Sequence, residues 1–132
     1  MTDVDSNGLF EKGMKFRELH RFKDAAAVFK ELRTKDPGFS EAWFWEAVSL
    51  DNRGDEMNAI PCYKESIRLG LSDDLLIKAF LWLSSSLSKT GDSDDAEKYL
   101  NMALNHSKFR QYYEFKLLSQ KIERRIEKQR KK

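Results

Sequence analysis

The chain has 132 residues, of which 40% are hydrophobic and 35% are charged, and it carries a formal net charge of +2. This length predicts one compact domain with a hydrophobic core and is too short for two ordinary domains. Leu, Ala, Glu and Lys recur, only two residues are proline, and strand-like runs of alternating Val, Ile and Thr are absent, so helix is favoured over sheet.

Targeting and redox signals favour the cytoplasm. The N-terminal stretch MTDVDSNG is acidic and polar, without the basic region and apolar run of a secretory signal. No stretch reaches the roughly 20 apolar residues that span a bilayer. The single cysteine, Cys62, cannot form an internal disulfide, which fits a reducing compartment. We therefore expect a cytoplasmic protein without a transmembrane segment.

The first predicted element is a helical hairpin over residues 6–39. Apolar and small residues recur at helical spacing on both sides of the interruption LHRF, and Pro37 closes the second helix. The recurring residues are Leu9, Gly13, Phe16, Ala25, Val28, Phe29 and Leu32.

Two further hairpins are predicted over residues 40–73 and 77–110. The same residue types return at offsets of 34 and then 37 residues, which indicates an internal repeat. Gly54 and Gly91 mark the turns, and Ser93 is available to cap the last helix. The small residues predict where paired helices approach closely, and the larger ones fill the space between pairs. The aligned sets are Gly13, Ala47 and Ser84; Ala25, Ala59 and Ala96; and Phe29, Tyr63 and Leu100.

The last predicted element is a basic amphipathic helix over residues 110–132. Its apolar stripe is about 120° wide at about 100° per residue. Tyr113 and Leu117 lie on a second side, so the first half is expected to be buried more fully, and the end is expected to fray after the last apolar residue. Such a helix would cover the exposed face of the last repeat. The stripe consists of Tyr112, Phe115, Leu118, Ile122 and Ile126.

The three copies resemble the tetratricopeptide repeat family, and the resemblance covers approximately residues 6–109. Copy two has Leu71 where proline is usual, and copy three lacks both the usual aromatic residue and the proline. The resemblance implies an all-α fold, a right-handed superhelical array of three hairpins over residues 1–109 followed by the capping helix. The residues that carry it are Leu9, Gly13, Phe16, Ala25, Phe29, Pro37, Trp43, Ala47, Leu50, Ala59, Tyr63, Phe80, Ser84, Leu87, Ala96, Leu100 and Ala103.

The resemblance also implies a concave groove, lined by the first helix of each copy, that binds extended peptides or helices. Relatives that hold the carboxylate tails of large heat-shock chaperones use Lys, Asn and Arg at five groove positions. Here these positions carry Phe10, Met14, Trp45, Lys78 and Trp82, and only the lysine fits. The residues placed on the groove or its edge are Phe10, Met14, Arg17, Phe44, Trp45, Val48, Asp51, Lys78, Leu81, Trp82 and Ser85.

This lining is apolar and aromatic, so the predicted ligand is a hydrophobic or amphipathic peptide or helix rather than a chaperone tail. Within the stretch EAWFWEAVSL, Trp43 matches the core position of the repeat and is expected to hold copy two against copy one. Phe44 and Trp45 are not required by the repeat and are predicted for recognition. In the alternative interpretation, the C-terminal helix or a second copy of the chain covers these rings.

The charge is concentrated at the C-terminus. From Arg110 onward there are nine Lys and Arg against three Glu, while the rest of the chain has a net charge of −4. One interpretation is a solvated helix whose terminal cations suit the helix dipole. In the other, this basic tail contacts an acidic protein, an anionic lipid surface or nucleic acid, of which nucleic acid is the least supported. The tail residues are Arg124, Arg125, Lys128, Arg130, Lys131 and Lys132.

Catalytic patterns are weak. His20 and His106 are the only histidines and have no metal-ligand spacing, so neither a metal nor another cofactor is expected. The stretches SLSK and KTG match two β-lactamase motifs but share Lys89 within one helix and its turn, which indicates a chance match. Cys62 is expected to be a small buried thiol. The sequence thus predicts a non-catalytic protein-interaction module, with a self-associating structural subunit as the alternative.

Overall fold

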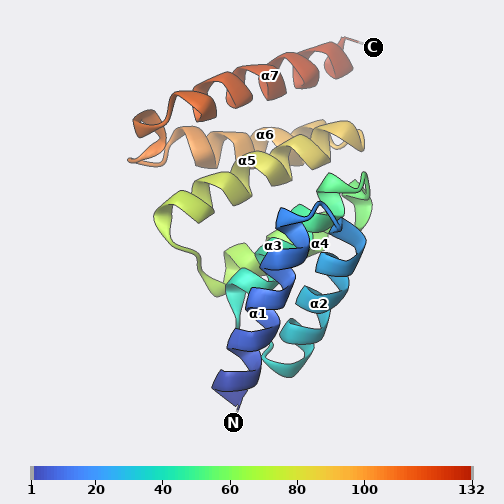
Figure 1. Cartoon of the computed structure of the whole chain (residues 1–132). Coiled ribbons are helices and arrows are strands. Elements are labelled where there is room, and N and C mark those ends of the chain that lie inside the picture. Colours follow the sequence, from blue (N-terminus) through green and yellow to red (C-terminus); the bar gives the residue numbers. More distant parts are fainter. Residues whose placement is uncertain (1, 132) are drawn as a thin grey trace. The chain divides into compact units, whose positions relative to one another are not determined.

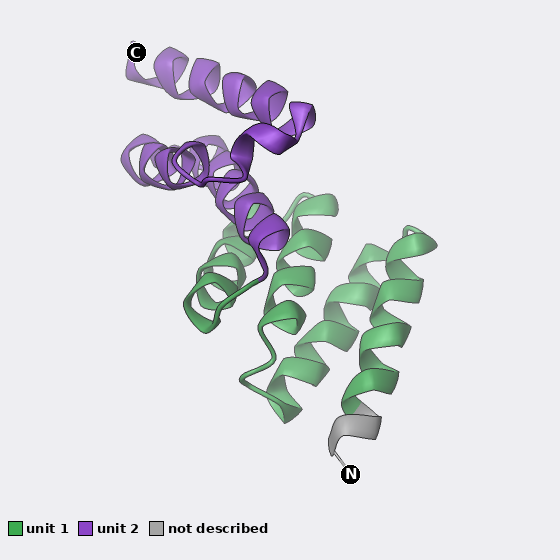
Figure 2. Ribbon diagram, turned by 90° about the vertical axis from the view of Figure 1, so that its left-hand side faces the viewer, with its two compact units in different colours: residues 1–71 green, residues 72–132 purple. Residues whose placement is uncertain are grey.

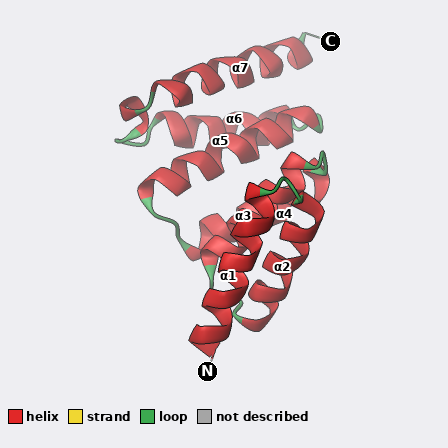
Figure 3. Ribbon diagram, in the orientation of Figure 1, coloured by secondary structure: helices red, strands yellow, loops and turns green. Residues whose placement is uncertain are grey.

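The computed structural model describes residues 2–131, with side chains from Ser6 onward, and this part of the chain is helical without a strand. The helices are joined by short turns (Figures 1 and 3). They are α1 (Thr2–Glu18), α2 (Phe22–Lys35), α3 (Ser40–Asn52), α4 (Glu56–Leu69), α5 (Asp73–Lys89), α6 (Ser93–Leu104), the short 3-10 helix η1 (Phe109–Gln111) and α7 (Tyr113–Arg130).

The chain divides into two compact units (Figure 2). Unit 1 is Met1–Leu71 and contains α1 to α4, and unit 2 is Ser72–Lys132 and contains α5 to α7 with η1. In unit 1 each helix packs against the next, so α3 lies between α2 and α4. In unit 2 α7 packs against both α5 and α6. This is an all-α array of helical hairpins, as the repeat pattern predicts.

The same turn joins the helices of each hairpin. His20, Gly54 and Gly91, at offsets of 34 and 37 residues, donate their N–H groups to the carbonyl three residues earlier, at N···O distances of 2.9, 2.9 and 3.3 Å. All three have positive φ, with values of 58°, 83° and 91°. Glycine adopts this left-handed conformation without strain, whereas a histidine does so at a cost. His20 is exposed, as expected for a turn residue.

The small repeat residues lie where paired helices meet. A Cβ atom added to Gly13 of α1 would come within 2.6 Å of the Phe29 ring of α2. Ser84 of α5 donates its hydroxyl to the Ala96 carbonyl of α6 at 2.5 Å. Ala47 is fully buried in unit 1. The predicted close approach between the first and second helix of a hairpin is therefore confirmed.

Helix α7 differs from its prediction at both ends. Three residues of the predicted inward stripe, Phe115, Ile122 and Ile126, are buried, Leu118 is half-buried, and Tyr112 is 39% exposed and precedes the helix. Tyr113 and Leu117, however, are 71% and 49% exposed, so the first half is not buried on a second side. The helix also continues to Arg130 rather than fraying after its last isoleucine, because polar contacts described below hold its end.

The cap of α6 is a smaller correction. Asp92, not Ser93, is the N-cap residue, and its carboxylate accepts a hydrogen bond from the Asp95 N–H at 3.2 Å. Asp55 plays the same part for α4. A carboxylate at this position satisfies an N–H of the first turn that has no partner within the helix.

Candidate functional site

Arg17 and Trp45 form the centre of the candidate site in unit 1. The guanidinium carbon of Arg17 lies 4.1 Å from the centre of the Trp45 ring, so the cation is attracted to the ring face. The Nη1 atom of Arg17 is 3.9 Å from the Met14 sulfur, one turn earlier on α1. All three side chains are half-buried. We call this cluster of a thioether, a cation and an indole the Arg17–Trp45 face.

Two N–H groups of this face have no hydrogen-bond acceptor among the described residues. They are Nε of Arg17 and Nε1 of Trp45, and both atoms are buried. Burial disfavours the charged guanidinium and lowers the pKa of Arg17, which neighbouring Glu18 opposes. A buried donor without an acceptor costs about 1–3 kcal/mol. Neither nitrogen is exposed, so a ligand oxygen would reach either group only after a side-chain movement, and accepting from it would then recover part of this cost.

Three other predicted groove residues of unit 1 pack into its interior. Phe10 is half-buried, with its ring stacked on Phe39 at a centroid distance of 5.6 Å. Phe44 is fully buried, 4.8 Å from the Trp45 ring and 6.2 Å from the Tyr63 ring of α4. Val48 is buried as well. The placement of Phe44 and Val48 on an open face is corrected, because α3 has a neighbouring helix on each side.

The remaining predicted groove residues are Asp51 of unit 1, whose carboxylate accepts a hydrogen bond from the Tyr63 hydroxyl, and four residues of unit 2. Leu81 is fully buried in α5, so it is a core residue and not an open contact. Lys78 and Trp82 are half-buried on the same helix. Each unit is described by itself, so a groove that continues from the Arg17–Trp45 face to these residues stays a prediction.

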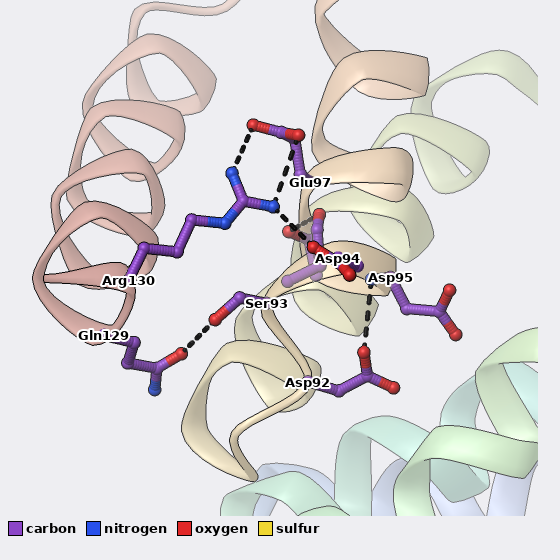
Figure 4. Close-up of polar contacts among 9 residues, drawn as sticks. Asp92, Ser93, Asp94, Asp95, Glu97, Gln129 and Arg130 are labelled. Carbon is purple, nitrogen blue, oxygen red and sulfur yellow. Dashed lines mark hydrogen bonds and ion pairs between the residues drawn. The ribbon is translucent and has the colours of Figure 1, made fainter. Parts of the chain in front are cut away.

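The basic tail divides into inward and outward cations. Arg130 reaches from α7 to two carboxylates of α6, at 2.9 Å from Glu97 Oε2 and 2.9 Å from Asp94 Oδ1 (Figure 4). Gln129 accepts a hydrogen bond from the Ser93 hydroxyl at 2.8 Å. The predicted N-cap residue therefore joins α6 to α7, and these contacts hold the end of the helix.

Arg125 also faces inward. Its Nη1 donates to the hydroxyls of Ser85 and Ser88 on α5, at 3.2 and 3.0 Å. Of the six tail cations predicted from the sequence, Arg125 and Arg130 thus fasten α7 to its own unit. Arg124, Lys128 and Lys131 are exposed, and Lys132 lies outside the described residues.

Comparison with known proteins identifies the repeat. The sequence profile described as Tetratrico peptide repeat matches residues 40–114, more than half of the chain. The chain belongs to the tetratricopeptide repeat family. No curated protein sequence matches it significantly.

Solved structures share this tetratricopeptide repeat fold at low sequence identity. The Yersinia enterocolitica type III secretion translocator chaperone SycD is 19% identical with a TM-score of 0.77, covering 98% of this chain and 86% of that one. SycD in complex with a peptide of the translocator YopD is 20% identical with a TM-score of 0.73, covering 94% and 91%. The TPR2B domain of yeast Sti1 in its pHsp70 complex is 15% identical with a TM-score of 0.76, covering 92% and 98%. At these identities the likeness shows the fold alone.

A contact between the first two tetratricopeptide repeats was missed from the sequence. Arg33 of α2 lies 2.6 Å from the buried carboxylate of Glu46 on α3, and this hydrogen bond raises the pKa of Arg33. The same guanidinium lies 4.1 Å from the centre of the Trp43 ring. Trp43 donates its Nε1–H to the Pro37 carbonyl at 3.0 Å. Trp43 therefore joins copy two to copy one, as predicted, but through a cation rather than in the deep core.

Chemistry at Cys62 is suppressed by its surroundings. The thiol is buried, and this burial raises its pKa to about 12, so it is protonated at neutral pH. The nucleophilic form of cysteine is the thiolate. Among residues 6–131, whose side chains the structure describes, no cluster of three or more His, Cys, Asp or Glu could hold a metal ion. No described helix combines the length and hydropathy of a bilayer span.

Proposed function

We propose that this chain is a non-catalytic adaptor that holds an apolar or amphipathic segment of a partner protein on the Arg17–Trp45 face. The observation that carries the proposal is the pair of buried N–H groups without acceptors beside a half-buried indole. Aromatic and Arg side chains are over-represented where binding energy is concentrated. The repeat fold supports an interaction role, since its helical arrays present extended binding surfaces.

The chemistry of the face specifies the ligand class. Met14 and the exposed part of Trp45 favour an apolar side chain, because thioether and indole surfaces are poorly hydrated. The two N–H groups favour a carbonyl or carboxylate oxygen beside that side chain. At the positions of the carboxylate clamp, Phe10, Met14 and Trp45 replace polar residues, which argues against a chaperone-tail ligand. Lys78 and Trp82 stay proposed groove residues of unit 2.

Peptide-bound relatives of the fold support this proposal by analogy. SycD has been solved in complex with a peptide of YopD, and the TPR2B domain of Sti1 has been solved in complex with pHsp70. Localisation in the cytoplasm is part of the proposal.

The alternative function is a structural subunit in which a second copy of the chain occupies the Arg17–Trp45 face. Such self-association would give an apparent mass that rises with protein concentration on a sizing column.

The test compares two tryptophans of one helix. Short peptides are selected from a random displayed library on the full chain, and their affinities are measured for Trp45→Ala and Trp43→Ala. Both rings are covered by an arginine at 4.1 Å, but only Trp43 has its N–H bonded within the chain. We expect Trp45→Ala to weaken binding by about 30-fold, the effect of a hot spot near 2 kcal/mol.

The control, Trp43→Ala, should lower stability while leaving peptide affinity within about twofold, well below a hot-spot effect. If Trp45→Ala binds the selected peptides as tightly as the unaltered chain, the proposed face is wrong.

A further inference from the structure

Unit 2 contains a surface pocket that the proposed function does not use. It lies where the end of α6, η1 and the start of α7 meet, and its volume is about 790 Å³. Leu104, the buried Phe109 and the exposed Tyr112 and Tyr113 supply apolar lining. We call it the η1–α7 pocket. Ligand pockets commonly combine an apolar lining with a few polar groups.

Large apolar side chains gather around this pocket. Six such side chains are exposed in the part of the chain that the structure describes, and three of them are Tyr112, Tyr113 and Leu117, at 39%, 71% and 49%. The outer face of a terminal helix in a repeat array is normally polar, because it meets solvent. A tyrosine at an interface provides an apolar ring and a polar hydroxyl together.

Cations beside the rings have no partner within the described chain. Arg110 and Lys116 line the pocket and are exposed, and their charged side chains make no hydrogen bond or ion pair with another described residue. Arg125 and Arg130 differ, since α5 and α6 occupy their guanidinium groups. The charge that remains around the pocket is therefore positive and available, with Glu123 as the one acidic residue of its lining.

We infer that the η1–α7 pocket docks a second protein segment, in which one large apolar side chain is flanked by Asp or Glu. The apolar side chain would contact Leu104 and Phe109, and the carboxylates would meet Arg110 and Lys116. This charge pairing accelerates encounter and selects the partner more than it adds affinity. The pocket shares no residue with the Arg17–Trp45 face, so the adaptor would hold two partners or two segments of one partner.

Two other anionic ligands fit less well. Nucleic acid would stack on tyrosine rings and contact cations, but Glu123 in the lining repels phosphate, and the Leu104 lining offers nothing to a base. A lipid surface binds a helix with apolar residues along one whole face. In α7 the exposed large apolar side chains are limited to Tyr113 and Leu117, so the helix lacks a continuous apolar face for a lipid surface.

The test uses three single variants of the full chain, Tyr113→Ala, Lys116→Glu and Arg124→Glu. All three residues are exposed on α7, so each variant should fold, and Arg124→Glu is the matched control for the charge change. Peptides selected from a random displayed library should include a class with an apolar residue flanked by acidic ones. We expect the first two variants to weaken this class by about tenfold or more, and the control by less than about twofold.

Four outcomes would overturn the inference. The first is that selection yields no peptides in which acidic residues flank an apolar one, and the second is that such peptides lose their affinity in Trp45→Ala instead. The third is that the chain binds single-stranded oligouridylate or phosphatidylserine vesicles and that Lys116→Glu abolishes this binding. The fourth is that the chain self-associates and that Tyr113→Ala abolishes the self-association. Because Trp45→Ala tests the other face separately, failure of this inference is distinguishable from failure of the proposed function.

Discussion

Alanine at Gly13 should destabilise the chain even though alanine is the better helix former. In α1 the added methyl carbon would lie 2.6, 2.7 and 3.0 Å from three carbons of the Phe29 ring. Optimal carbon–carbon contacts are about 3.5–4.0 Å, so the overlap approaches about 1 Å. Phe29 is fully buried and cannot swing into solvent. Overpacking of this kind costs about 1–3 kcal/mol.

Gly8→Ala on the same helix provides the matched control. Apart from its chain neighbours and the backbone of its own helix, no described atom lies within 4 Å of the methyl carbon that it would add. It should gain up to about 1 kcal/mol, the difference in helix propensity between glycine and alanine. Because both variants make this gain, subtracting their free energies of unfolding isolates the overlap at Gly13, expected at about 1–3 kcal/mol.

Urea unfolding followed by circular dichroism measures both variants, with the free energy of unfolding taken at a common slope. Gly8→Ala should be at least as stable as the unaltered chain, and Gly13→Ala less stable than Gly8→Ala by the stated margin. Equal stability of the two variants would refute the close approach of α1 and α2.

Three further predictions concern a turn, a buried thiol and a capping helix. His20→Gly should raise the free energy of unfolding by about 1 kcal/mol, because a φ of 58° strains a histidine but not a glycine. Gly54→Ala should lower the free energy of unfolding by a similar amount, because the backbone at this position has a φ of 83°. Burial raises the pKa of Cys62 from 9.0 to about 12, so the stability that the thiol contributes is complete below pH 9 and is lost as the pH rises toward 12. In urea titrations at a series of pH values, Cys62→Ala should reduce the fall in the free energy of unfolding between pH 9 and 12. The same pH dependence in the variant and the unaltered chain would contradict this prediction. Arg125→Ala should speed amide hydrogen exchange in α7, because its guanidinium bonds two serine hydroxyls of α5, while exposed Arg124→Ala should not.

The fold was predictable because its signals are local and repeated. The left-handed turn residues His20, Gly54 and Gly91 recur at the offsets that the sequence shows. Gly13 is small because Phe29 occupies its side of the helix. The spacing and size of these residues therefore sufficed to show a resemblance to the tetratricopeptide repeat family.

The site was less predictable because its contacts join distant residues. Trp45 was predicted for recognition, and it is half-buried and packs against the core of unit 1; nothing in the local pattern indicated that Arg17 would lie over its ring. Phe44 was assigned to recognition because one helix sequence does not reveal that neighbours bury it on both sides. Arg130 pairs with a carboxylate 33 residues earlier, beyond any helical spacing, so the fixed end of α7 could not be predicted.

The indole N–H resonances of ¹⁵N-labelled protein test the central claim most directly. The Trp45 Nε1–H has no acceptor among the described residues, whereas that of Trp43 is bonded to the Pro37 carbonyl at 3.0 Å. Gaining an acceptor deshields such a proton, so titration with a selected apolar peptide should move the Trp45 resonance downfield and leave that of Trp43 in place. A shift confined to Trp43, or a saturating peptide that leaves the Trp45 resonance unmoved, would contradict the proposed function.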